Sequence, residues 1–328
     1  MRRTTIVTLL ALLVPTACGG SDSDGDPDPP GGGDGYTGTL VAEGTGSVHT
    51  LDLGSSDPWV ARDNAGVYDA VAVVLPQNEV LTATDSYGSP LVVEVKDLTT
   101  FGVKENFEWP YDEEVGRVHA LAVSGDGAHL AALLEKLGPQ YLEVMNRDDG
   151  TVVYSGLDLI SDTTLTWTSN DELVFALALS HEEDPDRWGA IGAVPLDRLY
   201  DATDELMIDL YAIFTRAEWE AGVREIAISS DGSQLLYTRG GDLWVVDFVP
   251  GATPHQLTTG PIYDGGAQFS PDGESIAFAA GDRDFSTETY VIPNHRDEPL
   301  FIDHGQDAGD EYLTGEDTLI DRMLAWAP

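Results

Sequence analysis

Cysteine and lysine are the residues that this sequence nearly lacks. Cys18 is its one cysteine, so the chain cannot form an internal disulfide. Lysine occurs three times, and lysine and arginine together number 16 against 58 aspartates and glutamates, which gives a net charge of −42. This balance excludes nucleic acid and anionic membrane surfaces as partners, because both would be repelled. It is compatible with a saline habitat, where salt screens the self-repulsion.

Sequence motifs of hydrolytic enzymes are also missing. The chain has no Gly-x-Ser-x-Gly stretch, which would place a nucleophilic serine on a strand-to-helix turn. Its seven histidines show no paired spacing of the His-Glu-x-x-His kind. A serine peptidase and a zinc hydrolase of these types are therefore not expected.

The N-terminus has the composition of an export signal. Arg2 and Arg3 precede an apolar run at 6–14, which is too short to span a bilayer stably. Cys18 follows where a signal peptidase would cut, and the stretch VPTAC resembles a bacterial lipobox. We therefore expect residues 1–17 to be a lipoprotein signal peptide and Cys18 to carry the lipid. The alternatives are a chance thiol after an uncleaved anchor and, for the route, either Sec or twin-arginine export.

Residues 18–35 are predicted to be a tether. After the cysteine, the segment GGSDSDGDPDPPGGGDG contains no apolar side chain that could join a core. Its alternating aspartates superficially match a calcium loop, but the downstream bidentate glutamate of such a loop is missing. A solvated acidic linker is the expected structure, and it leaves residues 36–328 as one folded domain.

A strand–turn–strand pattern recurs through the remaining chain. Three segments align on a turn that ends in Asp-Gly: HALAVSGDGAHLAALLE from His119, EIAISSDGSQLLYTRG from Glu225 and GAQFSPDGESIAFAAG from Gly265. Weaker copies begin at Ala70 and Thr164. In such a turn, aspartate accepts hydrogen bonds from nearby backbone amides and glycine adopts the positive φ that closes a hairpin. Turn chemistry therefore explains the motif without a ligand.

Further strand-like sequence follows each hairpin and gives units of four strands. Four strands in roughly 40 to 45 residues are the signature of a propeller blade. First strands are expected near residues 69, 118, 162, 223 and 264, and the C-terminal LIDRMLAWAP supplies a sixth. GTLVAEG and SVHTLDLG, near the N-terminus, would complete that last blade. The sequence predicts an all-β, six-bladed β-propeller with Velcro closure between its N- and C-terminal strands.

Two details of the blades are less regular. PHQLTTG and EPLFIDHG are expected as outermost, fourth strands of their units. The fourth unit is longer than the others, and its residues 203–219 are expected to contain a fourth strand and a loop, with a short amphipathic helix as the alternative. Surplus residues in a repeat array form surface loops, often on a binding face.

The segment LWVVDFVPGATPHQLTTGPIYDGGAQFSPDGESIAFAAG resembles the repeats of TolB-type propellers, which are PD40 or WD40-like repeats. The resemblance covers residues 36–328. It implies a binding scaffold in the cell envelope, which presents a channel mouth or a rim to a protein or peptide. We therefore expect a non-catalytic, monomeric lipoprotein without a cofactor, bound to a bacterial membrane only through its lipid. The periplasmic and the cell-surface side both stay open, and the outer membrane is favoured.

One set of charged residues stands out in the repeat alignment. Four of the six units carry an aspartate six positions before the end of the first strand, and two units carry an arginine one step further along. The aspartates are Asp69, Asp162, Asp264 and Asp321, and the arginines are Arg224 and Arg322. Because first strands line the channel of a propeller, these residues are expected at a channel mouth that binds a basic peptide or a cation such as calcium.

Two alternatives accompany this site. Each aspartate would otherwise only cap the start of its own strand. A cation held in the channel would instead favour an envelope enzyme of the hydrolase, lyase or lactonase type over a binding scaffold.

Overall fold

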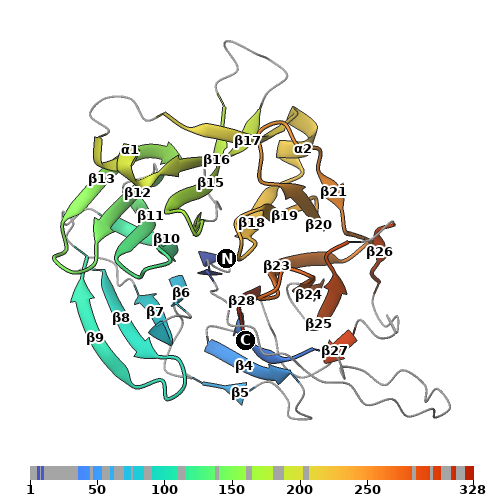
Figure 1. Ribbon diagram of the computed structural model, residues 1–328, viewed down its shortest axis with the longest axis horizontal. Helices are drawn as coiled ribbons and strands as arrows, with labels where there is room; N and C mark the ends of the chain where they lie inside the picture. Colours follow the sequence, from blue (N-terminus) through green and yellow to red (C-terminus); the bar gives the residue numbers. More distant parts are fainter. Residues whose placement is uncertain are drawn as a thin grey trace.

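The computed structural model of the protein is a ring of β-sheets around a central axis (Figure 1). The structure describes residues 6–7, 9–10, 36–44, 47–53, 60–62, 70–74, 77–84, 91–109, 115–136, 140–159, 165–179, 188–201, 207–282, 286–295, 298–303, 312–314 and 322–328. Within these residues the strands form six blades. The predicted all-β, six-bladed propeller is therefore confirmed.

Each blade contains four antiparallel strands, which follow one another from the innermost to the outermost position. Blade I has β28 (Arg322–Ala327), β3 (Gly38–Gly44), β4 (Ser47–Leu53) and β5 (Val60–Ala61); blade II has β6 (Ala70–Val74), β7 (Glu79–Thr84), β8 (Val92–Asp97) and β9 (Val103–Glu108); blade III has β10 (Val115–Val123), β11 (His129–Lys136), β12 (Gln140–Asn146) and β13 (Val152–Leu159). Blade IV has β14 (Leu165–Trp167), β15 (Glu172–Ala178), β16 (Gly189–Pro195) and β17 (Asp209–Phe214); blade V has β18 (Val223–Ile228), β19 (Gln234–Arg239), β20 (Asp242–Asp247) and β21 (His255–Gln256); blade VI has β23 (Tyr263–Phe269), β24 (Ser275–Asp282), β25 (Ser286–Pro293) and β27 (Tyr312–Thr314).

The core lies between the blades. Side chains alternate between the two faces of a strand, so each sheet packs one apolar face against each of its neighbours. Trp167 and Phe175 of blade IV pack with Leu133 of blade III, and all three are fully buried. Phe214 of blade IV meets the ring of Tyr237 from blade V edge-on, with ring centroids 5.5 Å apart. Every blade therefore depends on both of its neighbours.

The ring is closed in blade I by strands from the two ends of the chain. β28 pairs antiparallel with β3, and β3 in turn pairs with β4. Trp326 of β28 is 2% exposed, and its indole N–H donates to the carbonyl of Thr37 at 3.1 Å. The ring of Tyr36 lies edge-on to this indole at 6.1 Å. This pairing confirms the predicted Velcro closure.

The Asp-Gly turns join the two inner strands of a blade, as the sequence predicted. After β23, the Ser270 hydroxyl and a backbone N–H both donate to Oδ1 of Asp272, at 2.5 and 3.0 Å. Gly273 has a φ of +75°, which only glycine adopts without strain. The same contacts recur around Asp126 and Asp231 in the turns after β10 and β18. The motif is therefore a hairpin turn.

The outer strands depart from prediction in one place. EPLFIDHG does not supply the fourth strand of blade VI, because β26 (Leu300–Phe301) pairs in parallel with β22 (Thr258–Thr259), and β27 takes the outer position. The reason is apolar burial: Ile302, next to β26, is 1% exposed in the core shared by blades V and VI. In blade IV the expected fourth strand is present as β17, between α1 (Leu196–Asp201) and α2 (Arg216–Glu220).

The N-terminal segment lies at the centre of the ring (Figure 1). β1 (Ile6–Val7) pairs in parallel with β10, and β2 (Leu9–Leu10) pairs in parallel with β6. Cys18 and the rest of residues 11–35 fall outside the described residues, so the cleavage, the lipid and the tether stay predictions. No helix among the described residues is both long and apolar enough to cross a membrane.

The closing strand allows a direct test of the ring. Substitution Trp326→Ala leaves a cavity between β28 and its neighbours, and removing a fully packed tryptophan costs about 3 to 5 kcal/mol. We expect a loss of this size in the free energy of unfolding, measured by urea denaturation. Val103→Ala is the control, because Val103 is 53% exposed and the change should stay within about 0.5 kcal/mol. Equal effects of the two substitutions would contradict a closed ring.

Candidate functional site

The structure describes only part of the predicted ring of charged residues. Asp264 is the second residue of β23, and Arg224 is the second residue of β18 in the neighbouring blade. Arg322 begins β28, where its backbone pairs with Glu43, and its side chain is not described. The other three aspartates of the set fall outside the described residues. A ring of four carboxylates around the channel therefore stays a prediction.

Asp264 is completely buried. It is 0% exposed, and the two described residues at the same place in the repeat, Val118 and Val223, are 3% and 7% exposed. In these three blades the position thus packs between blades, and in blade VI a carboxyl group occupies the place that blades III and V fill with valine. For Asp264, the burial favours the interpretation as a strand-start residue over direct contact with a ligand at an open mouth.

The carboxyl group of Asp264 is shielded from solvent and has few polar partners. Its backbone N–H donates to the carbonyl of Gly241 at 2.7 Å, but neither carboxylate oxygen has a well-formed hydrogen bond among the described residues. Burial raises the pKa of Asp264 to about 7, the hydroxyl of Thr258 partly opposes this rise, and the charge of Asp242 adds to it. Both neighbours belong to blade V or follow it directly. The side chain therefore faces the junction between blades V and VI.

Glu225 links the same two blades next to Arg224. Its Oε2 accepts hydrogen bonds from the backbone N–H of Gly266 at 2.7 Å, from the Tyr263 hydroxyl at 3.1 Å and from the Thr238 hydroxyl at 3.2 Å. Glu225 has a φ of +54°, and β18 has a bulge at this point. The sequence analysis did not identify Glu225. The sequence feature that could have pointed to this contact is the glycine pair in YDGG. A Cβ on Gly265 would lie 2.4 Å from Oε2 of Glu225, so a residue without a side chain is needed there.

Bulges recur in the innermost strands. The pairing with the neighbouring strand shifts in register between the strand start and the turn in four of them: β10, β18, β23 and β28. A bulge turns side chains away from the regular alternation and is common beside binding sites. In β10 it accompanies His119, whose Nε2 lies 2.8 Å from Oε2 of Glu135 on β11. Irregular backbone of this kind thus surrounds the channel in four described blades.

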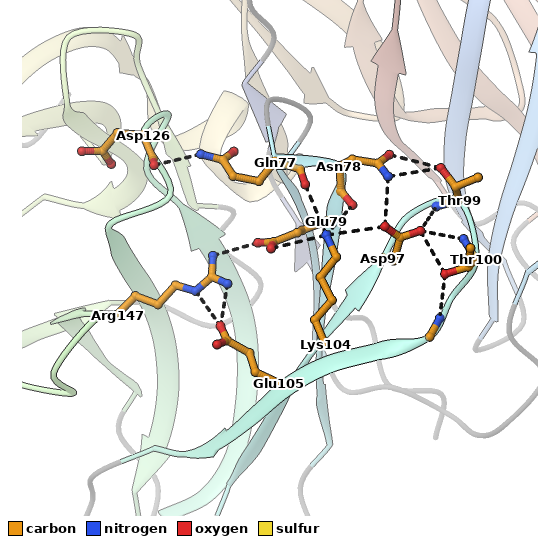
Figure 2. Close-up of polar contacts among 11 residues, drawn as sticks. Gln77, Asn78, Glu79, Asp97, Thr99, Thr100, Lys104, Glu105, Asp126 and Arg147 are labelled. Atoms are coloured by element: carbon orange, nitrogen blue, oxygen red, sulfur yellow. Dashed lines mark hydrogen bonds and ion pairs between the residues drawn. The ribbon is translucent and has the colours of Figure 1, made fainter.

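A second polar cluster joins blades II and III (Figure 2). Arg147 donates from Nη1 to Glu79 at 2.9 Å and from Nη2 to Glu105 at 2.6 Å, while Nζ of Lys104 lies 3.6 Å from Glu79. Gln77 of blade II donates to the backbone carbonyl of Asp126 in blade III at 2.9 Å. Burial works against the charge of Arg147, but its bonds to both glutamates raise its pKa. We interpret this cluster as a clamp between blades.

The described residues contain no group of three histidine, cysteine, aspartate or glutamate side chains placed to hold a metal ion. The cation predicted at the channel mouth would depend on aspartates outside those residues, so it stays a prediction.

Comparisons with known proteins support the fold. No family model matches the chain, and no curated protein matches it. Similar solved structures include TolB from Acinetobacter baumannii, with a TM-score of 0.51, 13% identity and coverage of 81% of this chain and 62% of that one. A putative TolB from Agrobacterium tumefaciens has a TM-score of 0.54, 13% identity and coverage of 80% and 86%. This chain has the propeller fold of TolB. At such identities, the likeness concerns the fold alone.

A chain of the nidogen/laminin complex is also similar, with a TM-score of 0.52, 14% identity and coverage of 79% of this chain and 89% of that one. The TolB-like propeller expected from the repeats is thus confirmed at the level of fold. The aligned part spans 62% of the length of the Acinetobacter TolB.

Asp264 generates a prediction about pH. Its pKa of about 7 in the folded protein exceeds the ordinary value of 3.8, so the folded protein keeps a proton that the unfolded chain loses between these pH values. The free energy of unfolding should therefore fall as pH rises through this window. Asp264→Asn removes this penalty, and its stability relative to wild type should rise by up to about 4 kcal/mol between about pH 4 and pH 8.

The matched control is Asp231→Asn. Hydrogen bonds from the Ser229 hydroxyl and the Ser233 N–H lower the pKa of Asp231. Its contribution to stability is present above the ordinary pKa of 3.8 and is lost as pH falls below that value. The difference between Asp231→Asn and wild type should therefore stay nearly constant from about pH 5 to pH 8 and change, with the opposite sign to Asp264→Asn, only at lower pH. Chemical denaturation across the pH range measures both variants. A pH-independent difference between Asp264→Asn and wild type would show that the Asp264 carboxyl titrates normally.

Proposed function

We propose that the protein is an exported, lipid-anchored scaffold of the bacterial cell envelope, which binds a protein or peptide at the mouth of its propeller channel without catalysis. The observation that carries this proposal is the TolB propeller fold, shared over 80% of the chain with the Agrobacterium protein. The export-type N-terminus and Cys18 support the location. Residues 18–35 would act as the tether that holds the propeller away from the membrane.

The contact surface that we favour is the mouth formed by blades V and VI. Arg224, Glu225 and Tyr263 are all partly exposed there, and the hydrogen bonds of Glu225 to Tyr263 and Gly266 fix its carboxylate in place. A rigid site lowers the entropy that binding must overcome. Asp264 would support this rim from beneath, within the blade junction.

A polar or basic peptide suits this surface. The net charge of −42 attracts cationic segments and speeds their association. The nidogen/laminin structure supports the general idea, since a similar propeller occurs there in a protein complex.

Membrane attachment is tested by Cys18→Ser. Without the thiol no lipid can be added, so we expect the variant to accumulate unprocessed or to appear in the soluble fraction, whereas wild type sediments with membranes and incorporates labelled fatty acid. Fractionation and labelling of the expressing cells measure this difference. Fatty-acid labelling that persists in the Ser variant would contradict lipidation at Cys18.

The binding surface is tested by photo-crosslinking in intact cells. A photoreactive phenylalanine analogue at Tyr263 should give a discrete adduct with an envelope protein, because the side chain lies at the favoured mouth. The same analogue at Val103, which is 53% exposed on the outer strand of blade II, is the control. Equal adducts at both positions would speak against a specific mouth.

Metal analysis of the purified protein then separates the scaffold from the enzyme alternative. A tightly held stoichiometric cation that disappears when Asp69 and Asp321 are replaced by asparagine would favour an enzyme with a channel cation.

A further inference from the structure

One buried carboxyl group lies beside the contacts that hold the proposed channel mouth. Asp264 is directly followed by Gly265 and Gly266, and the backbone N–H of Gly266 donates to Oε2 of Glu225 at 2.7 Å. Tyr263, which directly precedes Asp264, donates its hydroxyl to the same oxygen at 3.1 Å. The chain on both sides of Asp264 therefore determines where the Glu225 carboxylate lies.

The side chain of Asp264 points into the junction between blades V and VI. Its partner in the ladder with β24 is Ala280, which packs in the core shared by these two blades. Directly opposite residues of an antiparallel pair share one face of the sheet, so Asp264 faces the same core. It is 0% exposed, and neither carboxylate oxygen has a well-formed hydrogen bond among the described residues. A negative charge at this place would be costly.

The surroundings of Asp264 do not neutralise such a charge. Among the described residues, no basic side chain bonds to either of its oxygens. Arg239 instead binds Glu218 of α2 at 2.6 Å, and the charge of Asp242 opposes ionisation of Asp264. The described titratable groups on the elements around this junction are Arg224 and Glu225 of β18, Arg239 of β19, Asp242 of β20, His255 of β21, Tyr263 of β23, Glu288 and Tyr290 of β25, and Asp303 after β26.

The contact between Glu225 and Gly266 is made by irregular backbone. Glu225 has a φ of +54°, which costs a residue other than glycine energy, and Gly266 has a φ of +55°. The ladders of β18 and β23 both shift in register here. Few regular ladder bonds therefore hold this part of the mouth, and a change at the start of β23 is enough to release the Glu225 carboxylate.

Ionisation of Asp264 is coupled to opening of the junction. In the closed junction, burial raises the pKa of Asp264 to about 7, whereas a carboxyl group that reaches water has the ordinary value of 3.8. The closed junction thus keeps a proton that the open junction loses between these pH values. Rising pH in this window favours the open junction, and falling pH favours the closed one.

We propose that Asp264 is a pH-sensitive latch of the channel mouth. Its neutral carboxyl group keeps blades V and VI in contact and holds Tyr263, Gly266 and Glu225 in one arrangement. Its ionisation admits water to the junction and releases Glu225. The mouth then binds its partner more tightly in a mildly acidic medium than above neutral pH. The effect on binding rests on the proposed function, whereas the opening of the junction does not.

Hydrogen exchange of the Gly266 backbone N–H tests the latch without a partner. NMR follows this amide in the purified protein from about pH 5 to about pH 8, with each rate corrected for the exchange of an unfolded chain. The equilibrium constant for opening should rise about tenfold for each pH unit up to about pH 7 and level off above it. The N–H of Leu98 in blade II, which donates to the carbonyl of Asn78 at 2.9 Å, should show no such rise.

Two substitutions remove the titrating group. Asp264→Val copies the residue that blades III and V carry at this place, and Asp264→Asn keeps the shape of the carboxyl group. Both should make the opening at Gly266 independent of pH. Asp231→Asn is the matched control in blade V, because the Asp231 carboxylate accepts hydrogen bonds within a hairpin turn. It should leave the pH dependence at Gly266 as in wild type.

Three results would overturn the proposal. These are the same pH dependence at Gly266 in wild type and in both Asp264 variants, an equal loss of that dependence in Asp231→Asn, and a carbon-13 titration of the Asp264 carboxyl with its midpoint near the ordinary value. The proposed function fails separately. An opening at Gly266 that follows Asp264, with no cross-linked adduct from the mouth at any pH, would support the latch and contradict the proposed binding surface.

Discussion

The ladder between β28 and β3 is the contact on which the rest of the propeller depends. Each blade buries both of its faces against neighbours, so an open ring would leave two apolar faces in water. Closure joins Trp326 to Thr37 across 289 residues, and bringing together chain ends that far apart costs about 5 kcal/mol of entropy. Burial of Trp326 with Leu40, Ala42 and Val291 offsets a cost of this size.

The basic residues of the chain are concentrated at contacts between elements. Arg147 clamps blade III to blade II, and Arg239 of β19 binds Glu218 of α2 at 2.6 Å while its guanidinium covers the ring of Trp244 at 3.6 Å. The chain has 16 lysines and arginines against 58 aspartates and glutamates, so the basic residues are too few to pair with most of the acidic side chains. A strong negative field is therefore a property of the whole surface, and it biases the protein towards cationic partners.

Local chemistry made the fold predictable from the sequence. Asp-Gly turns and two-residue alternation act within a few residues, so the hairpins, their number and the closing strands could be placed in advance. The positions of β26 and β27 could not be predicted, because strands of two or three residues are too short to show periodicity. The burial of Ile302 between blades determines where β26 pairs. The candidate site could be predicted only in part, for a similar reason. The repeat frame located Asp264, but its environment comes from Thr258 and Asp242, and the contacts of Glu225 depend on a bulge without a local signature.

The position of β3 also determines how the propeller would respond to tension. β3 is the first of the twenty-four blade strands along the chain; it begins at Gly38 and is held between β28 on one side and β4 on the other. A pull on the preceding segment along the strand direction therefore loads two antiparallel ladders in shear, whereas an outer strand would peel away one bond at a time. Forced unfolding is governed by the unfolding rate, and hydrogen bonds loaded together lengthen the lifetime under force. If the protein is attached through its N-terminal side, a pulling force reaches β3 first, and this strand would withstand the force better than an outer strand would.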